Sequence, residues 1–138
     1  MATHPFGVFF TVADRHPSFI QKIRQLSTEI PEIMMAVADL LGDGYKSLDR
    51  SQGAIVSTDG KKQLRYYREQ PDSSLTQGFS YSIRFHQSHL TVTEFFSIEE
   101  LLEISRLLKR KIERVLETKI DDVQLILDVK FDEAEVDQ

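Results

Sequence analysis

The pattern of hydrophobic and polar positions is clearest between residues 97 and 131, where a helical period gives way to alternation. In the first part, apolar residues recur every three or four positions, at Leu101, Ile104, Leu108, Ile112 and Val115. This spacing predicts one long amphipathic helix with a buried stripe. From Val123 to Phe131, apolar and polar residues then alternate except at Ile126, which predicts a strand with one buried face.

The start of this helix has the sequence of a helix-capping motif. Ser97 and Glu100 have the spacing of a capping box, in which each side chain accepts a hydrogen bond from the other residue's backbone N–H. The second half of the helix is rich in basic residues, namely Arg106, Lys109, Arg110, Lys111 and Arg114. We interpret this run as a solvated outer face, and a phosphate-binding surface is the alternative.

The N-terminal part of the chain predicts a strand and then a pair of helices. Residues 6–13 form a short apolar run typical of a strand. Helical spacing begins after Pro17 and continues to Gly42, which is a suitable helix stop. Because Pro31 lacks a backbone N–H and disfavours the interior of a helix, we predict two helical pieces that meet there.

The middle of the chain predicts antiparallel strands separated by turns. The strands are expected at residues 54–58, 62–69, 78–86 and 90–96, with loops at 42–53 and 70–77. Asp59-Gly60 joins the first two, and we interpret it as a type I′ hairpin turn. In the third strand, aromatic and aliphatic residues alternate with polar ones, as in a sheet that is covered on one side.

Together these patterns predict an α+β fold. We expect an antiparallel sheet of about five to six strands, with an N-terminal helix pair and a long C-terminal helix packed on one face. Residues 1–131 would form a single domain, and 132–138 an acidic C-terminal tail. The first and last strands have no hairpin partner in the sequence. They can lie at the sheet edges, pair with each other, or pair with a second copy of the chain.

Composition and charge narrow the class of protein. The 138 residues are 41% hydrophobic and 28% charged, which is ordinary for a globular domain. The formal net charge of −5 is concentrated at the end of the chain: residues 121–138 hold seven acidic side chains and one lysine. The rest is close to neutral, which argues against a nucleic-acid partner. With no cysteine and no long apolar run, we expect neither disulfides nor a membrane span, and a cytoplasmic location.

Catalytic and metal-binding motifs are not evident in the sequence. It contains no G-x-S-x-G and no glycine-rich phosphate-binding motif. His86 and His89 bracket a predicted turn, and we interpret them as exposed residues because two imidazoles alone bind a metal weakly. The spacing of Asp39, Asp43 and Asp49 does not match a calcium loop. We therefore expect no cofactor and no metal.

The most interesting side chains are cationic and aromatic residues on neighbouring predicted strands. They are Arg65, Tyr66, Tyr67, Arg68 and Arg84. Alternation puts Arg65 and Tyr67 on one face of their strand, and Tyr66 and Arg68 on the other. Such a surface can bind a nucleic-acid strand or an acidic peptide. The simplest interpretation is a solvated sheet face on which tyrosine rings bridge the core and water.

Our leading hypothesis is a non-enzymatic protein-binding module, similar to an adaptor or chaperone, that acts as a homodimer. Two adjacent aromatic pairs send rings to both faces of their strands and leave some rings in need of a partner: Phe9-Phe10 and Phe95-Phe96. One alternative is a small-ligand-binding protein or enzyme, with a pocket between the sheet and the long helix that uses Tyr66, Tyr81 or Arg84. The other is nucleic-acid binding through the segment from Arg65 to Arg68.

Overall fold

The computed structural model describes residues 6–13, 17–47, 53–67, 80–87 and 96–126, which form two helices and a six-stranded sheet. In chain order the elements are β1 (Phe6–Ala13), α1 (Phe19–Leu41), β2 (Tyr45–Ser47), β3 (Ala54–Ser57), β4 (Gln63–Tyr67), β5 (Ser80–Gln87), α2 (Ile98–Leu116) and β6 (Asp122–Ile126). The predicted α+β class and antiparallel sheet are confirmed. The predicted strand at 90–96 and the tail at 132–138 lie almost wholly outside the described residues.

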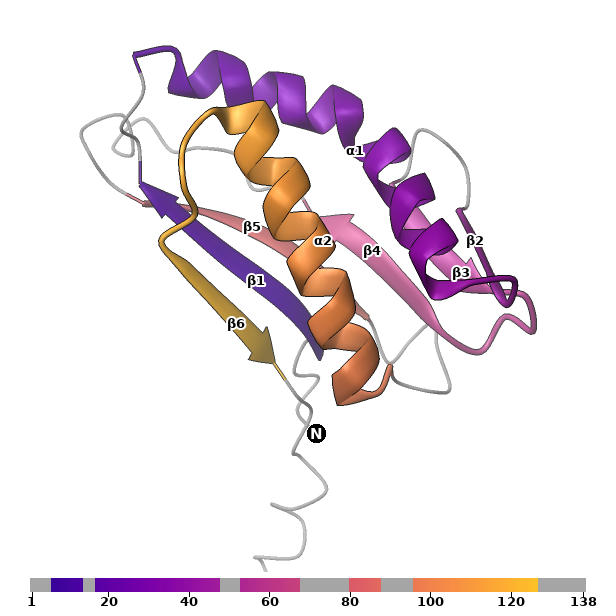
Figure 1. The fold of residues 1–138 in the computed structure, drawn as a ribbon. Helices are drawn as coiled ribbons and strands as arrows, with labels where there is room; N and C mark the ends of the chain where they lie inside the picture. Colours follow the sequence, from indigo (N-terminus) through magenta and orange to yellow (C-terminus); the bar gives the residue numbers. More distant parts are fainter. Residues whose placement is uncertain (1–5, 14–16, 48–52, 68–79, 88–95, 127–138) are drawn as a thin grey trace, which may run out of the picture.

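The sheet has the order β2-β3-β4-β5-β1-β6, and every neighbouring pair is antiparallel. The first and last of the described strands, β1 and β6, pair with each other, with Phe10 opposite Val123. On its other side β1 lies beside β5 (Figure 1), and their register puts Phe10 opposite Ile83 as well. The apolar first strand is therefore an interior strand of the sheet, and this chain itself supplies its partners.

Both helices cover the same face of the sheet (Figure 1). Helix α1 packs on β2 and β3, α2 packs on β1 and β6, and the two helices pack against each other. The predicted stripe of α2 is buried in the core, including Leu101, Ile104, Leu108, Ile112 and Val115. From the sheet, alternate residues such as Val8, Phe10, Ile83 and Phe85 join the same core. The opposite face of the sheet carries neither helix.

The prediction of an N-terminal helix pair is wrong, because α1 is one continuous helix that contains Pro31. Figure 1 shows it as a single ribbon that bends along its length. An interior proline costs about 3 kcal/mol through the lost hydrogen bond and the steric clash. The halves on both sides of Pro31 bury apolar side chains in the same core, among them Ile30, Met34 and Val37. Burial of each such side chain contributes about 1.5–3 kcal/mol, which offsets the cost of the proline.

The β3–β4 hairpin turns at the predicted residues, but its turn type was predicted wrongly. A type I′ turn needs a positive φ at both central residues. Among the described non-glycine residues only Glu117 has a positive φ, whereas Gly60 has a φ of 78°. The carboxylate of Asp59 accepts hydrogen bonds from the Ser57 hydroxyl (2.6 Å) and the Lys61 N–H (3.0 Å). These bonds hold Asp59 in place, and Gly60 alone supplies the left-handed conformation.

The predicted capping box at the start of α2 is confirmed. The N–H of Glu100 donates to the Ser97 hydroxyl oxygen at 3.1 Å, and the N–H of Ser97 donates to the Glu100 carboxylate at 2.9 Å. The segment predicted as a loop at residues 42–53 differs from expectation, because it contains the short edge strand β2. None of the described helices combines the length and the apolar character that crossing a bilayer requires.

Candidate functional site

The face of the sheet without helices gathers arginine and aromatic side chains from three adjacent strands, β4, β5 and β1. Alternation places Phe9, Arg65, Tyr67, Arg84 and His86 on this face, because their sequence neighbours enter the core on the other face. The strand register sets these side chains next to one another. Arg84 lies opposite Phe9 on one side and Tyr67 on the other, and His86 lies opposite Arg65. We call these five residues the Arg–aromatic face.

The rings of this face are in contact. The Tyr67 ring stacks on the imidazole of His86, with the ring centres 3.9 Å apart and the planes inclined by 4°. The Phe9 ring is also close to His86, with a centre-to-centre distance of 6.0 Å and the planes inclined by 38°. The guanidinium carbon of Arg84 is 5.1 Å from the centre of the Phe9 ring, which is a cation–π distance. The result is a short row of rings with a cation beside it.

His86 is the least expected member of the Arg–aromatic face. It lies within β5 and is half-buried, whereas the sequence placed it at an exposed turn. Burial, and then the positive charge of Arg84, lower the pKa of the imidazole. Its buried Nδ1 has no hydrogen-bond partner among the described residues. The ring is therefore neutral at neutral pH, and it adds aromatic surface to the face without adding charge.

The structure brings together three of the five residues that the sequence singled out: Arg65, Tyr67 and Arg84. Tyr66 lies on the core face instead, where its ring is 5.4 Å from that of Phe85 and its hydroxyl is 3.4 Å from the Ser27 hydroxyl. Arg68 lies outside the described residues. Phe9 and His86 were not assigned to this site. The adjacent pair Phe9-Phe10 indicated that one ring lies on the face away from the core, because only one of two adjacent rings on a strand can enter the core.

The residues proposed for a ligand pocket do not converge. Tyr66 and Tyr81 pack with the core, whereas Arg84 lies on the opposite face of the sheet. A cavity of about 370 Å³ instead lies between α1 and α2. Its lining consists of Gln25, Glu29, Glu32, Ile33, Lys111, Arg114 and Val115, all from the two helices. No pattern in the sequence indicated this cavity, because its walls come from segments far apart in the chain.

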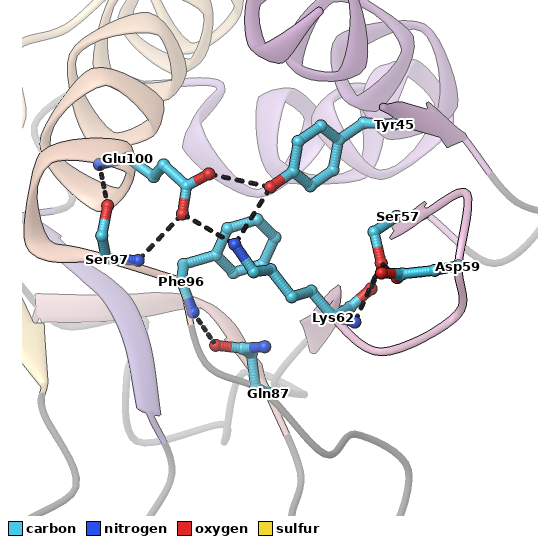
Figure 2. A network of polar contacts seen from close by, with 8 residues as sticks. All are labelled: Tyr45, Ser57, Asp59, Lys62, Gln87, Phe96, Ser97 and Glu100. Atoms are coloured by element: carbon cyan, nitrogen blue, oxygen red, sulfur yellow. Dashed lines mark hydrogen bonds and ion pairs between the residues drawn. The ribbon is translucent and has the colours of Figure 1, made fainter. Parts of the chain in front are cut away.

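A polar network at the other end of the helix layer joins β2, α2 and the residue just before β4 (Figure 2). The Tyr45 hydroxyl donates to the carboxylate of Glu100 at 2.8 Å. The ammonium group of Lys62 donates to both, at 3.3 Å to the Tyr45 oxygen and 3.3 Å to Glu100. The ring of Phe96 stacks on Tyr45, with a centre-to-centre distance of 5.8 Å. The same carboxylate caps α2, so this network fixes the start of the helix against the edge of the sheet.

The network keeps each of its groups in the ordinary charge state. Burial and the hydrogen bond to Glu100 raise the pKa of Tyr45, so its hydroxyl stays protonated. Burial alone would lower the pKa of Lys62, but the bonds to Tyr45 and Glu100 outweigh it and raise the pKa. For Glu100, burial raises the pKa, but the Ser97 N–H and the two side-chain donors outweigh burial and lower it. A protonated tyrosine and a protonated lysine are not bases, which points to a structural role for this network.

The described residues contain no group of three or more side chains suited to hold a metal ion. No protein-family model, no curated protein and no solved structure matches this chain. The features of the described residues that bear on function are the Arg–aromatic face and the cavity between the helices.

Proposed function

We propose that this protein is a non-enzymatic protein-binding module, similar to an adaptor or chaperone, that acts as a homodimer and binds an acidic segment of a partner through the Arg–aromatic face. The observation that carries the proposal is the Tyr67–His86 stack with Arg84 beside it on the face without helices. Tyrosine and arginine, together with tryptophan, are enriched among the side chains that dominate the energy of protein interfaces.

The chemistry of the face favours a partner with acidic and apolar groups together. Arginine guanidinium groups bind carboxylates through paired hydrogen bonds, and the adjoining rings offer contact area. The side chains project from paired strands, so little conformational freedom is lost when a partner binds. Tyr67 is exposed enough, at 37% of its surface, to be reached.

Single-stranded nucleic acid is the competing occupant of this face, because bases also stack on exposed rings beside cations. The near-neutral charge of residues 1–120 makes it the weaker candidate. Binding of an oligonucleotide would show itself by a steep loss of affinity with salt, through the release of counterions.

The test is a displayed library of short random peptides, selected on the immobilised protein and followed by fluorescence titration of the selected peptides. We expect enrichment of sequences that combine Asp or Glu with apolar residues. The double substitution Tyr67→Ala and Arg84→Gln should weaken their binding by about tenfold or more, as the loss of interface anchors does. The matched control is Arg106→Gln on the outer surface of α2, which should leave the affinity unchanged.

Two outcomes would reject the proposal. One is unchanged peptide affinity in the double variant when circular dichroism shows that it is folded. The other is tighter, strongly salt-dependent binding of oligothymidylate at the same residues, which would assign the face to nucleic acid.

A further inference from the structure

The cavity between α1 and α2 has walls of opposite charge, and we call it the inter-helix groove. Glu29 and Glu32 from α1 line one wall, and Lys111 and Arg114 from α2 line the other. The apolar lining comes from Ile33 and Val115, both of which are buried. The two walls thus present opposite charge along a shared apolar base.

The helical period creates each wall. Glu29 and Glu32 are three positions apart on α1, and Lys111 and Arg114 are three positions apart on α2, so each pair projects from one side of its helix. Gln25 extends the acidic wall, and its amide donates to Glu29 at 3.0 Å. The sign of the charge is therefore uniform within each wall and opposite between the walls.

In the part of the chain that the structure describes, no ion pair crosses the groove. Away from the groove, Lys22 of α1 and Glu117, the residue that follows α2, form an ion pair at 3.4 Å. Glu32 and Arg114 are exposed to solvent, while Glu29 and Lys111 are partly exposed. Both walls are therefore open to charges from outside.

We propose that the inter-helix groove is the surface through which two copies of this chain pair. A two-fold axis along the groove would place the acidic wall of one copy over the basic wall of the other, and the reverse contact would form at the same time. A two-fold interface must be complementary to itself, and a surface with one acidic and one basic wall meets that condition. The inference rests on the homodimer part of the proposed function and names its interface.

This arrangement fits the binding role proposed for the sheet. The helices lie on one side of the sheet (Figure 1), and the alternation of buried residues along the strands puts the Arg–aromatic face on the other. Pairing through the helices therefore directs both Arg–aromatic faces away from the dimer interface. Two such faces on one particle can hold two acidic segments of a partner, which increases the overall affinity without any new contact.

The test uses two charge-reversal variants, each of which has walls of a single sign. In the first, Glu29→Lys and Glu32→Lys make both walls positive; in the second, Lys111→Glu and Arg114→Glu make both walls negative. Light scattering coupled to size-exclusion chromatography measures the mass at low ionic strength, where charge screening is weak. We expect a dimer for the unaltered chain, monomers for each variant alone, and a dimer again when the two variants are mixed.

The matched control reverses exposed charges that do not line the groove, through Arg24→Glu on α1 and Arg106→Glu on α2. This variant should remain dimeric. If circular dichroism shows that a double reversal is unfolded, the single reversals Glu32→Lys and Arg114→Glu replace it. Both residues are exposed. We expect each single variant to lose part of the dimer and the mixture of the two to recover it, both to a smaller extent than with the double variants.

The proposal is overturned if the groove variants stay dimeric, or if mixing folded monomeric variants gives no dimer. The first result would leave the homodimer in place and move its interface elsewhere. A monomeric unaltered chain would reject the homodimer as well. None of these three results affects the peptide-binding test on the Arg–aromatic face, whose residues lie on the opposite side of the sheet.

Discussion

The hydroxyl of Tyr45 donates a 2.8 Å hydrogen bond to Glu100, a residue 55 positions further along the chain. This bond joins β2, a three-residue strand at the sheet edge, to the first turn of α2. Lys62 bonds to both residues from the hairpin between β3 and β4 (Figure 2). The edge strand is thus held by side chains as well as by its few backbone hydrogen bonds.

Replacement of Tyr45 by Phe tests this network. The substitution keeps the ring that stacks on Phe96 and removes the hydroxyl that bonds to Glu100 and Lys62. We expect the free energy of unfolding to fall by about 1 kcal/mol, the usual net contribution of a hydrogen bond, with somewhat more if a charged partner is left poorly satisfied. Urea denaturation followed by circular dichroism measures it. Tyr67→Phe is the control, with an expected change within about 0.5 kcal/mol; equal losses would contradict the role of the network.

The pH dependence of stability follows from the lowered pKa of Glu100. Because the carboxylate is ionised more readily in the folded chain, its stabilising contribution is fully present above the ordinary glutamate pKa of 4.5. It is lost as the pH falls through the lower pKa of the folded state. In urea titrations from neutral to acidic pH, the unaltered chain should therefore lose more stability than Glu100→Gln. Parallel curves for the two proteins would contradict the direction of this shift.

The titration of His86 reports directly on the Arg–aromatic face. We expect its imidazole to titrate below 6.5 in NMR spectra, because burial and the charge of Arg84 disfavour the protonated ring. Arg84→Gln removes the repulsion, and Tyr67→Ala exposes the face of the ring, so each substitution should raise the pKa. A titration at or above 6.5 in the unaltered chain would mean that the ring is not packed as described.

Leu108 tests the packing of α2 on the sheet. Its side chain is fully buried, so Leu108→Ala should lower the free energy of unfolding by about 2–5 kcal/mol through lost burial and the cavity left behind. Leu102 provides a control on the same helix, because 36% of its surface is exposed. Leu102→Ala should cost much less in the same urea titration. A small loss at Leu108 would mean that the buried face of α2 is assigned wrongly.

Gly7 permits the close approach of β1 and β5. A Cβ atom at this position would lie 2.0 Å from the carbonyl oxygen of Phe85 and 2.6 Å from the Cα of His86. Since both are backbone atoms, the strands must separate, and Gly7→Ala should cost about 2 kcal/mol or more, as overpacking does. Gly44 is the matched control, because a Cβ there would meet no atom within 4 Å. In thermal unfolding, Gly44→Ala should leave the midpoint unchanged or slightly raised.

The elements predicted best were those whose formation depends on a few neighbouring residues. The bounds of β1 and the capping box of Ser97 and Glu100 agree with the structure. The prediction failed at Pro31, where a local rule about proline was outweighed by the burial of apolar residues on both sides of it. It also missed β2, because a three-residue strand is too short to show a period.

The candidate site was predicted only in part, because some of its contacts depend on neighbouring residues and others on how the strands and helices pack. Alternation along β4 separated Arg65 and Tyr67 from Tyr66 correctly, since the faces of a strand depend only on position. That Tyr67 would stack on His86 depends on the register between β4 and β5, which the residues of neither strand reveal alone. The acidic and basic walls of the inter-helix groove likewise become neighbours only when α1 and α2 pack together.

The sequence by itself determined the α+β class, the buried stripe of α2 and the alternating faces of the strands. These features depend on periodicity and capping, which involve residues close together in the sequence. Only the tertiary structure decided that β1 pairs with β6, that Tyr45 reaches Glu100, and which rings meet on the Arg–aromatic face. These contacts join residues far apart in the chain. They form because folding buries one shared core, and the packing of that core sets the order and register of the strands.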